Sequence, residues 1–600
     1  MNKIFNLLDL SARHSAQMGV RMREKSKDRA SKNKCWLVTA ALALAAYIVK
    51  NFFVGANVDE GYGIVVGYRL ATGDRLFLDM WEPHQTSAIF TALFIRPFLW
   101  ATGGMTDFLN LYLRGVYFAV HGAITYAIYR TLRKCIANME KGEAVCMAMV
   151  FFACSPKSIY VPEYSNLHIW FFTLLCLCLL WYQCEISPLR GKPWVVVLAG
   201  FFLTCDVLAY PSMVLLLPFC LFFILKKSGE KRGRDCGLFL LPCVVLAALF
   251  LGYVLSYMGP EQLLDSVRHI MGDGSHQGNL LYKLKICLKD FALMGVNLLV
   301  SVILAMAGSA VYAWIKKKKG SAACSFDGFL ISFLLLHILV MFYFWFTSEN
   351  DASYPRLVYI GIALIGIWCY VKCKDKDRTG LYLIGLSAVN YFAVIFFSNW
   401  GPEFLTPYFV WGCIGGFLCW KSYLDQRELS QELPQKRKTL FVCCGLLIFS
   451  CLFGYTFRVI GGEVVPSTLL EVRGYNHGGF RKWILTSYMT AYRYNQNLKI
   501  WPEAVPDGSR VLYVGPSQFF YMLGDCVISS PNTISTPVYD ESLLIYWEEH
   551  PERYPDVVVF ESWFGDIRVV EEDSFIMRWV QNEFPASEVI EYPYITVYKR

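Results

Sequence analysis

Two adjacent carboxylates, Asp59 and Glu60, stand directly after a hydrophobic stretch near the N-terminus of the chain. A second polar segment, Asp79–Gln85, follows in the same loop and contains Glu82 and His84. A carboxylate can take a proton from a hydroxyl or an amine, and a histidine can donate a hydrogen bond to an anion. Ionisable residues at a membrane boundary are costly and often functional. The two segments therefore predict an acid–base site beside a membrane surface.

The acidic pair has a second interpretation, in which it only caps a helix. Asp59 and Glu60 would then mark the start of a helix beginning near Gly61, where negative charge is favourable. Local sequence supports the two interpretations equally. The polar segment that follows favours the acid–base site.

The amino-acid composition indicates which class of protein positions these residues. Of the 600 residues, 55% are hydrophobic and 17% are charged. Soluble domains carry more charge. Apolar runs of about 18 residues or more recur along the chain, and each can cross a hydrocarbon core roughly 30 Å thick. We therefore expect a mostly α, polytopic transmembrane helical bundle and no nucleic-acid partner.

The N-terminus is expected in the cytoplasm. Residues 1–34 contain nine Lys or Arg against three Asp or Glu, and an apolar run follows at 35–54. A cleaved signal peptide is the alternative, but the run is long enough to serve as a retained anchor. Basic clusters later in the chain then orient the remaining spans by the positive-inside rule. The result is a multi-pass protein of the plasma membrane, with a bacterial envelope as the best fit.

Thirteen spans place every basic cluster inside. Residues 86–102 are left out, because Arg96-Pro97 lies near their middle and a span there would turn every later basic loop outward. We expect this segment to be an amphipathic helix on the outer surface, within an outer loop at 55–108. The predicted spans are 35–54, 109–130, 143–158, 166–185, 193–208, 210–225, 236–257, 291–315, 325–346, 356–371, 380–398, 405–420 and 439–458.

The last part of the chain differs in composition. Residues 501–600 carry seventeen Asp or Glu and six Lys or Arg. Strands are expected at 510–515 and 556–560, and helices at 517–523 and 541–550, an alternation typical of a small α/β layer. The chain therefore divides into a cytoplasmic N-terminus at 1–34, a membrane module at 35–458 and an extracytoplasmic α/β domain at 459–600.

The loop at 55–108 resembles the first outer loop of membrane glycosyltransferases of the GT-C class, such as protein O-mannosyltransferases and the aminoarabinose transferase of lipid A. In these relatives a catalytic Asp follows the first span, and the segment Gly73–Glu82 resembles their next stretch. Where the family often has a basic residue followed by prolines, this chain has Pro83-His84-Gln85. The resemblance covers roughly residues 35–460, mostly as topology plus this one loop.

The resemblance implies transfer of a sugar from a polyprenyl-phosphate carrier to a glycan, lipid or protein acceptor outside the cytoplasm, with inversion. Asp59 would be the general base, and Glu60 would orient the acceptor or the loop. Arg356 and His84, with Arg268 in reserve, would hold the carrier phosphate. The full set of expected substrate-binding residues is Glu82, His84, Glu163, Asn166, Arg268, His276, Tyr354, Arg356 and Asn399.

Several of these residues have an alternative structural role. Asn166 matches a second family acid but cannot act as a base, so Glu163 could replace it; either residue could instead cap a helix beginning near Leu167. Arg356 could bind a phosphate or extend to lipid headgroups. Asn399 could bind a sugar or anchor a helix at the interface.

No metal or cofactor is expected. The segment 265–278 contains two histidines and two aspartates, but their spacing matches no zinc motif. The 21 cysteines form no disulfide framework. Two other functions remain open: a polysaccharide polymerase or ligase, and a transporter or flippase of lipid-linked sugars. A flippase should show internal repeats and ionisable residues near the membrane midplane.

Overall fold

The structure is a computed structural model. It describes residues 38–55, 57–227, 232–271, 280–318, 357–373, 377–398, 401–402, 405–428, 445, 447–449, 451–453, 456, 458–459, 467–533, 540–564, 567–568 and 574–600. The chain forms two compact units, Met1–Asn51 and Phe52–Arg600. In the first unit the described residues are helical. The architecture below is that of the second unit.

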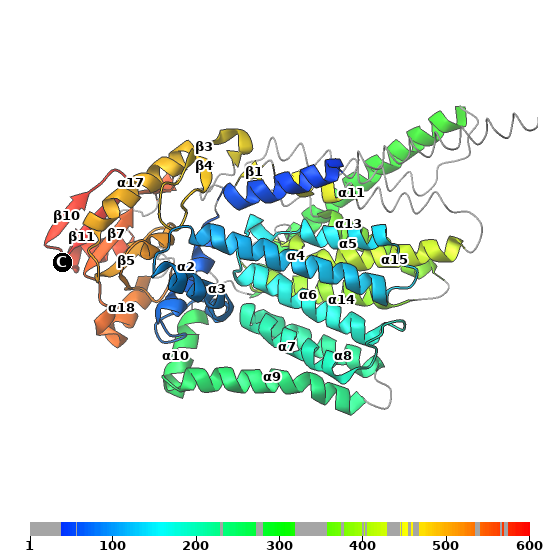
Figure 1. Ribbon diagram of the computed structural model, residues 1–600, viewed down its shortest axis with the longest axis horizontal. Coiled ribbons are helices and arrows are strands. Elements are labelled where there is room, and N and C mark those ends of the chain that lie inside the picture. The colour runs from blue at the N-terminus through cyan, green and yellow to red at the C-terminus, as the bar shows by residue number, and fades with distance from the viewer. Residues whose placement is uncertain are drawn as a thin grey trace, which may run out of the picture. The chain divides into compact units, whose positions relative to one another are not determined.

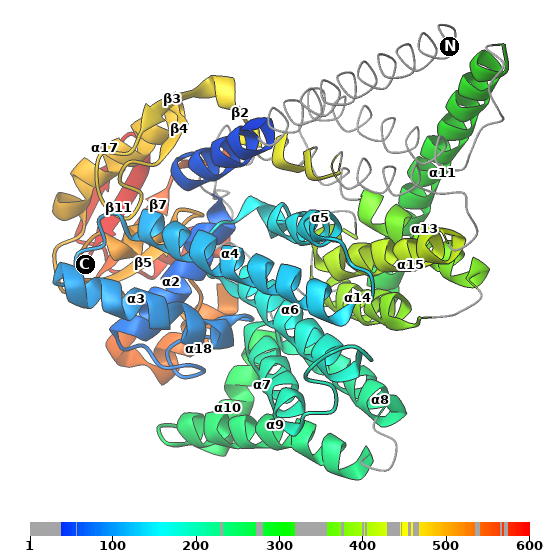
Figure 2. The ribbon, with the colours of Figure 1, turned by 45° about the vertical axis from the view of Figure 1, so that its right-hand side comes forward.

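Long helices make up most of the second unit, as the composition predicts (Figures 1 and 2). Helix α6 packs against α4 and α7, while α15 packs against α13 and α14. Glycines allow the contact between α13 and α15, because a Cβ on Gly366 would lie only 2.4 Å from the Cα of Gly416. The helices are α4 (Leu109–Cys135), α5 (Lys141–Phe152), α6 (Tyr164–Gln183), α7 (Pro193–Ala209), α8 (Leu217–Lys227), α9 (Arg232–Leu255), α11 (Leu280–Lys318), α13 (Leu357–Lys372), α14 (Thr379–Phe396) and α15 (Val410–Glu428).

Among the described residues, three helices are long and apolar enough to cross a membrane: α6, α9 and α14. Shorter apolar helices occur at Val38–Phe53, Pro193–Ala209, Pro211–Lys226 and Tyr359–Lys372. The count of thirteen spans stays a prediction, because 325–346 and most of 439–458 lie outside the described residues. One predicted span, 143–158, is helical only to Phe152, followed by a short 3-10 helix, η2 (Pro156–Ser158). Pro156 cannot donate a backbone hydrogen bond, so the α-helix ends before it.

The loop at 55–108 is largely helical. It contains α2 (Val58–Thr72), the 3-10 helix η1 (Gln85–Ser87) and α3 (Ala88–Thr102). The expected helix at 86–102 is therefore present. Its 15 residues of α-helix span about 22 Å, less than the roughly 30 Å of a hydrocarbon core. Its placement on the outer surface stays a prediction.

The C-terminal region contains a five-stranded sheet in the order β10-β11-β7-β5-β6. Strand β5 runs parallel to β6 and β7, while β11 is antiparallel to β7 and β10. The strands predicted at 510–515 and 556–560 are confirmed, and the helix predicted at 541–550 is present as α18. The segment 517–523 forms a 3-10 helix, η8. The bounds are β5 (Arg510–Val514), η8 (Gln518–Met522), β6 (Val527–Ile528), α18 (Asp540–Glu549), β7 (Val557–Glu561), α19 (Phe575–Asn582), β10 (Glu588–Glu591) and β11 (Ile595–Lys599).

Smaller elements flank this sheet. Helix α17 (Tyr488–Ala504) precedes β5, and three two-stranded antiparallel pairs lie outside the sheet. They are β1 (Arg458–Val459) with β2 (Ser467–Thr468), β3 (Val472–Tyr475) with β4 (Leu485–Ser487), and β8 (Trp563–Phe564) with β9 (Ile567–Arg568). The remaining short helices are η3 (Pro211–Leu216), α10 (Pro260–Met271), η6 (Thr406–Phe409), η7 (Leu469–Glu471) and η10 (Pro551–Arg553).

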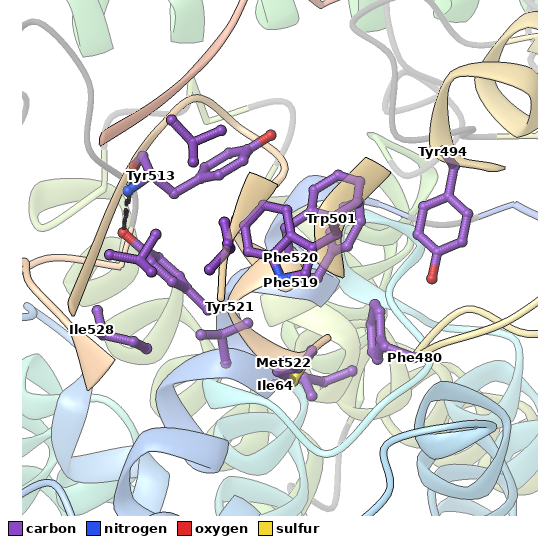
Figure 3. Packing of buried hydrophobic residues seen from close by; sticks show 14 of the residues in the cluster. Ile64, Phe480, Tyr494, Trp501, Tyr513, Phe519, Phe520, Tyr521, Met522 and Ile528 are labelled. Atoms are coloured by element: carbon purple, nitrogen blue, oxygen red, sulfur yellow. Dashed lines mark hydrogen bonds between the residues drawn. The ribbon is translucent and has the colours of Figure 1, made fainter. Parts of the chain in front are cut away.

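The core of the C-terminal region continues into the outer loop. One buried cluster joins Trp501, Tyr513 and Phe519 to Ile64 of α2 (Figure 3). Helices α2 and η8 pack against each other directly. Burial of large aromatic side chains across this junction stabilises it at about 25 cal/mol per Å² of apolar surface removed from water. The acidic pair therefore lies on a helix that is held from both the bundle and the sheet.

Candidate active site at the start of helix α2

Helix α2 begins at the acidic pair, and its cap is the residue before it. The Asn57 side chain accepts a hydrogen bond from the Asp59 backbone N–H at 2.9 Å. Asp59 and Glu60 then lie in the first turn, where the helix dipole favours negative charge. A helix does start here, as the capping interpretation predicts. It begins at Val58 and not near Gly61, and its N-cap is Asn57 and not Asp59 or Glu60.

Glu60 is held in a buried ion pair. Its two carboxylate oxygens accept hydrogen bonds from Nε and Nη2 of Arg114 on α4, at 2.9 and 2.8 Å. The same guanidinium also donates to the backbone carbonyls of Phe52 and Gly55. Both side chains are only 2% exposed, so this bidentate pair fixes the start of α2 against α4.

Asp59 lies on another face of the same helix and is half-buried. Residues three and four positions apart share a helix face, so Asp59 points the same way as Tyr62 and Gly63. The Tyr62 hydroxyl donates to Glu82 at 3.0 Å. A Cβ on Gly63 would lie 2.5 Å from the Cβ of Glu163, so α2 and this residue are in close contact. The face of Asp59 is therefore the face that meets Glu82 and Glu163.

Glu82 is buried and tied to the C-terminal region. It accepts a hydrogen bond from the backbone N–H of Thr533 as well as the one from Tyr62. Burial raises the pKa of Glu82, and these hydrogen bonds together with the charge of Arg69 oppose that rise only in part. The carboxyl therefore links the outer loop to the C-terminal region.

Glu163 and Asn166 have local structural partners. Glu163 is the N-cap of α6 and accepts from the backbone N–H groups of Ser165 and Asn166, at 3.0 and 2.9 Å. The Asn166 amide donates to two backbone carbonyls of the preceding turn. The capping interpretation therefore describes Glu163, and Asn166 stabilises the turn that precedes α6. Their expected contact with substrate stays a prediction.

His84 is packed between aromatic rings. Its imidazole is parallel to the Tyr164 ring, with centroids 4.1 Å apart, and its centroid lies 4.9 Å from that of Tyr210. Tyr164 also makes an edge contact with Tyr62. The Glu82 and His84 side chains thus contact two tyrosines, Tyr62 and Tyr164, that also contact each other.

One helical turn away lies a buried pair that sequence reasoning did not identify as part of the site. His168 follows Tyr164 by four residues and Asp206 precedes Tyr210 by four. The His168 Nδ1 and Asp206 Oδ1 are 2.6 Å apart, and both side chains are fully buried. Among the described residues, His168 Nε2 and Asp206 Oδ2 have no hydrogen-bond partner. In the sequence, the feature that could have indicated this pair is Asp206, because an acid that interrupts an apolar run is costly and often functional.

A charged cluster fixes the middle of the outer loop to the C-terminal region. Arg553 Nη2 lies 2.8 Å from Asp74 and 3.3 Å from Asp79. Arg69 of α2 pairs with Asp74 at 2.7 Å. Although burial opposes it, the hydrogen bonds and charges of Arg75 and Arg553 hold the pKa of Asp79 below its usual value. The segment that precedes Glu82 is thereby fixed to the C-terminal region.

A second arginine of the C-terminal region approaches the acidic pair. Arg481 is 4% exposed, and its guanidinium carbon lies 4.0 Å from the Phe519 ring centroid. A Cβ on Gly61 would be 3.9 Å from its Nη2. Burial lowers the pKa of Arg481 to about 10, with Glu60 among the groups that oppose this. Sequence reasoning missed Arg481 because about 420 residues separate it from the acidic pair.

The other expected residues fall in two groups. Arg268 lies on α10, is 76% exposed and pairs with Asp265 at 2.6 Å. The neighbouring His269 stacks on Trp81 at 4.6 Å, so α10 does contact the outer loop. His276, Tyr354, Arg356 and Asn399 lie outside the described residues. Within the part of the chain that the structure describes, no group of three or more His, Cys, Asp or Glu side chains could hold a metal ion.

Several solved structures resemble this chain, and three of them are described here. No protein-family model and no curated protein sequence matches it. ArnT from Cupriavidus metallidurans, bound to undecaprenyl phosphate, matches with a TM-score of 0.49 and 11% identity over 94% of this chain and 97% of ArnT. An oligosaccharyltransferase of Archaeoglobus fulgidus, in complex with Zn and sulfate, matches with a TM-score of 0.43 and 11% identity over 87% of this chain and 67% of its own.

The third is the oligosaccharyltransferase AglB from A. fulgidus in complex with an inhibitory peptide and a dolichol-phosphate. It matches with a TM-score of 0.43 and 12% identity over 88% of this chain and 70% of its own. The neighbours belong to the GT-C class that the sequence resembles. At these identities and TM-scores, the likeness gives no residue a role.

Proposed function

We propose that this protein is an inverting membrane glycosyltransferase, which moves a sugar from a polyprenyl-phosphate carrier to an acceptor outside the cytoplasm. The observation that carries the proposal is the different environment of the two neighbouring carboxylates. Glu60 is engaged on both oxygens by Arg114, whereas Asp59 is half-buried on the face that meets Glu82, Glu163 and Tyr164. A general base must reach the acceptor, and a carboxylate in a buried bidentate pair cannot.

In the proposed reaction, Asp59 accepts the proton of an acceptor hydroxyl or amine. The deprotonating oxygen or nitrogen attacks the anomeric carbon, and the bond from that carbon to the carrier phosphate breaks. Attack from the side opposite the phosphate inverts the anomeric configuration. The pair of Glu60 and Arg114 takes no part in these bond changes and keeps the first turn of α2 in place.

The leaving phosphate needs cations or hydrogen-bond donors. His84, stacked on Tyr164, is held so that a protonated ring can donate to a phosphate oxygen. Arg481 brings a guanidinium to the turn that carries Asp59, and its Nε has no hydrogen-bond partner among the described residues. Arg356 and Arg268 remain candidates for the same role at predicted outer positions. The carrier would reach these groups from the outer leaflet.

Transfer can be tested with the purified full-length protein and a labelled polyprenyl-phosphate sugar. A transferase releases the carrier phosphate and forms a glycosylated product with the opposite anomeric configuration. Movement of intact label across a vesicle membrane, without release of phosphate, would instead assign a flippase. Candidate acceptors are offered as three separate pools, glycan, lipid and protein, so that the labelled pool identifies the acceptor class.

The proposed orientation can be tested independently of activity. Glu588 is exposed on strand β10 of the C-terminal region. With Glu588→Cys in a background without native cysteines, we expect a membrane-impermeant maleimide to label intact cells. A matched cysteine at exposed Lys372, at the predicted cytoplasmic end of α13, should react only after the membrane is opened. Protection of position 588 in intact cells would contradict the orientation.

A further inference from the structure

A polar cavity of 770 Å³ lies far from the candidate active site. Its walls come from the ends of α4, α6, α8, α14 and α15, all of which the positive-inside pattern places on the cytoplasmic side. Tyr164, at the first residue of α6, belongs to the candidate active site, and Gln183, at the last, lines the cavity. The 20 residues of α6 rise about 30 Å, the thickness of a hydrocarbon core. The cavity therefore lies at the opposite membrane boundary.

Charges of both signs line this cavity. Lys226 lies in the last turn of α8 and Arg378 precedes α14, while Glu185 and Asp377 supply carboxylates. Asp377 accepts a hydrogen bond from the backbone N–H of Thr379, the first residue of α14, at 2.9 Å. A ligand with only negative charge would face these acids, and a ligand with only positive charge would face the two cations. A ligand carrying both charges matches the lining.

A buried side-chain amide, that of Gln183, also belongs to the wall of the cavity. Gln183 lines it and is only 9% exposed. Among the described residues, its Nε2 has no hydrogen-bond partner. Buried polar groups are nearly always hydrogen-bonded, because an unmet donor costs free energy. A polar ligand in the cavity would provide the missing acceptor.

The surroundings of the cavity favour a lipid over a soluble ligand. On α8, next to Lys226, Phe222 and Leu225 are 54% and 43% exposed. The Lys226 Nζ lies 5.1 Å from the Phe222 ring centroid, so the charged group lies at the edge of an apolar surface. Phe223 packs on Tyr382 with centroids 4.4 Å apart and joins α8 to α14 beside the cavity. Acyl chains can lie along α8 while the headgroup enters between the helix ends.

We propose that the cavity binds the headgroup of a phospholipid that carries both a phosphate and a primary ammonium. Lys226 and Arg378 contact the phosphate, Gln183 donates to a phosphate or ester oxygen, and Glu185 accepts from the ammonium. Basic pockets between membrane helices on the cytoplasmic side are a known way to recognise lipid headgroups. The site does not depend on the proposed transfer reaction, because it shares no residue with it.

The test uses the full-length protein in nanodiscs of phosphatidylethanolamine, phosphatidylcholine and phosphatidylglycerol in equal parts. Lipids that stay bound after extraction are counted by native mass spectrometry. We expect phosphatidylethanolamine to be retained in preference to the other two lipids. The ammonium of phosphatidylcholine has no N–H to donate to Glu185, and phosphatidylglycerol has no cation. Since the charged side chains are partly solvated, Lys226→Gln with Arg378→Gln should weaken retention by about tenfold. Lys372→Gln, a matched exposed lysine at the predicted cytoplasmic end of α13, should leave retention unchanged.

A second variant tests the ammonium contact. Glu185→Gln should keep phospholipid bound but remove the preference for phosphatidylethanolamine over phosphatidylglycerol. The proposal would be overturned if the double variant retained as much phospholipid as the unmodified protein. It would also be overturned if the unmodified protein retained phosphatidylglycerol as well as phosphatidylethanolamine. Saturable binding of water-soluble glycerophosphoethanolamine with no retained lipid would assign the cavity to a soluble ligand and would also overturn it. Thermal unfolding of each variant checks that folding is unaffected.

Discussion

The two faces of α2 carry neighbouring carboxylates in opposite environments. Glu60 faces α4, where Arg114 binds both of its oxygens and solvent is excluded. Asp59, rotated by about 100° around the helix axis, is half-buried and shares its face with Tyr62 and Gly63. Adjacency in sequence therefore does not imply a shared role. A buried bidentate pair is suited to holding a helix in place, and a partly solvated carboxylate is suited to exchanging a proton.

Removing Arg114 should have the largest effect on stability. Arg114→Ala leaves the Glu60 charge buried without its partner, which typically costs about 3–5 kcal/mol. We expect a correspondingly lower free energy of unfolding, measured by denaturant titration of the purified protein in detergent. The variant Arg114→Met with Glu60→Gln removes both charges and should recover much of the loss. If Arg114→Ala were as stable as the unmodified protein, the Glu60 face of α2 would not be structural.

Gly63→Ala acts on the Asp59 face with a smaller expected effect. Its Cβ would lie 2.5 Å from the Cβ of Glu163, so α2 and the start of α6 must move apart. Overpacking of this kind costs about 1–3 kcal/mol, and it should also slow transfer by displacing Asp59.

Gly122→Ala on α4 is the matched control, because nothing lies within 4 Å of the added Cβ. It should be neutral or slightly stabilising, as expected for alanine in a helix. Equal behaviour of the two alanine variants in unfolding and transfer assays would show that the contact between Gly63 and Glu163 does not position the site.

Glu82→Gln should have the smallest effect and a clear dependence on pH. Burial raises the pKa of Glu82 in the folded protein, so ionisation of this carboxyl at neutral pH destabilises the fold. The glutamine oxygen can still accept from the Thr533 backbone N–H, and its amide nitrogen can donate to the Tyr62 hydroxyl, so both contacts remain possible without the charge. We therefore expect Glu82→Gln to raise the melting temperature at neutral pH, and the gain to shrink as pH falls through the raised folded-state pKa. A gain that grew on acidification would contradict this account of Glu82.

Periodicity and turn chemistry predict much of the fold. Several of the apolar runs form helices with nearly the expected bounds, such as 193–208 for α7 (Pro193–Ala209) and 380–398 for α14 (Thr379–Phe396). Strands β5 and β7 were also predicted, because their apolar runs end at clear turns. Such features depend on residues close together in the chain, and local sequence is sufficient for them.

The partners of the site could not be predicted in this way. Arg114 is 54 residues from Glu60, and Arg481 is about 420 residues from the acidic pair. Thr533 contacts Glu82 through its backbone, which leaves no signal in the residue type. The sequence indicated that Asp59 and Glu60 matter, but only the packing of α2 against α4 and the C-terminal region shows that their environments differ.

The most direct test of Asp59 as the general base is the transfer rate of Asp59→Asn, measured in a single turnover with saturating carrier-linked sugar. Asparagine keeps the shape and polarity of the side chain but cannot take the acceptor proton. We expect normal expression, normal carrier binding and a transfer rate lower by about 10²–10⁴-fold. Asp107→Asn, a partly exposed acid of the same loop that pairs with Lys482, should transfer at the unmodified rate. A near-normal rate in Asp59→Asn would contradict the account and reduce Asp59 to an acid that stabilises the first turn of α2.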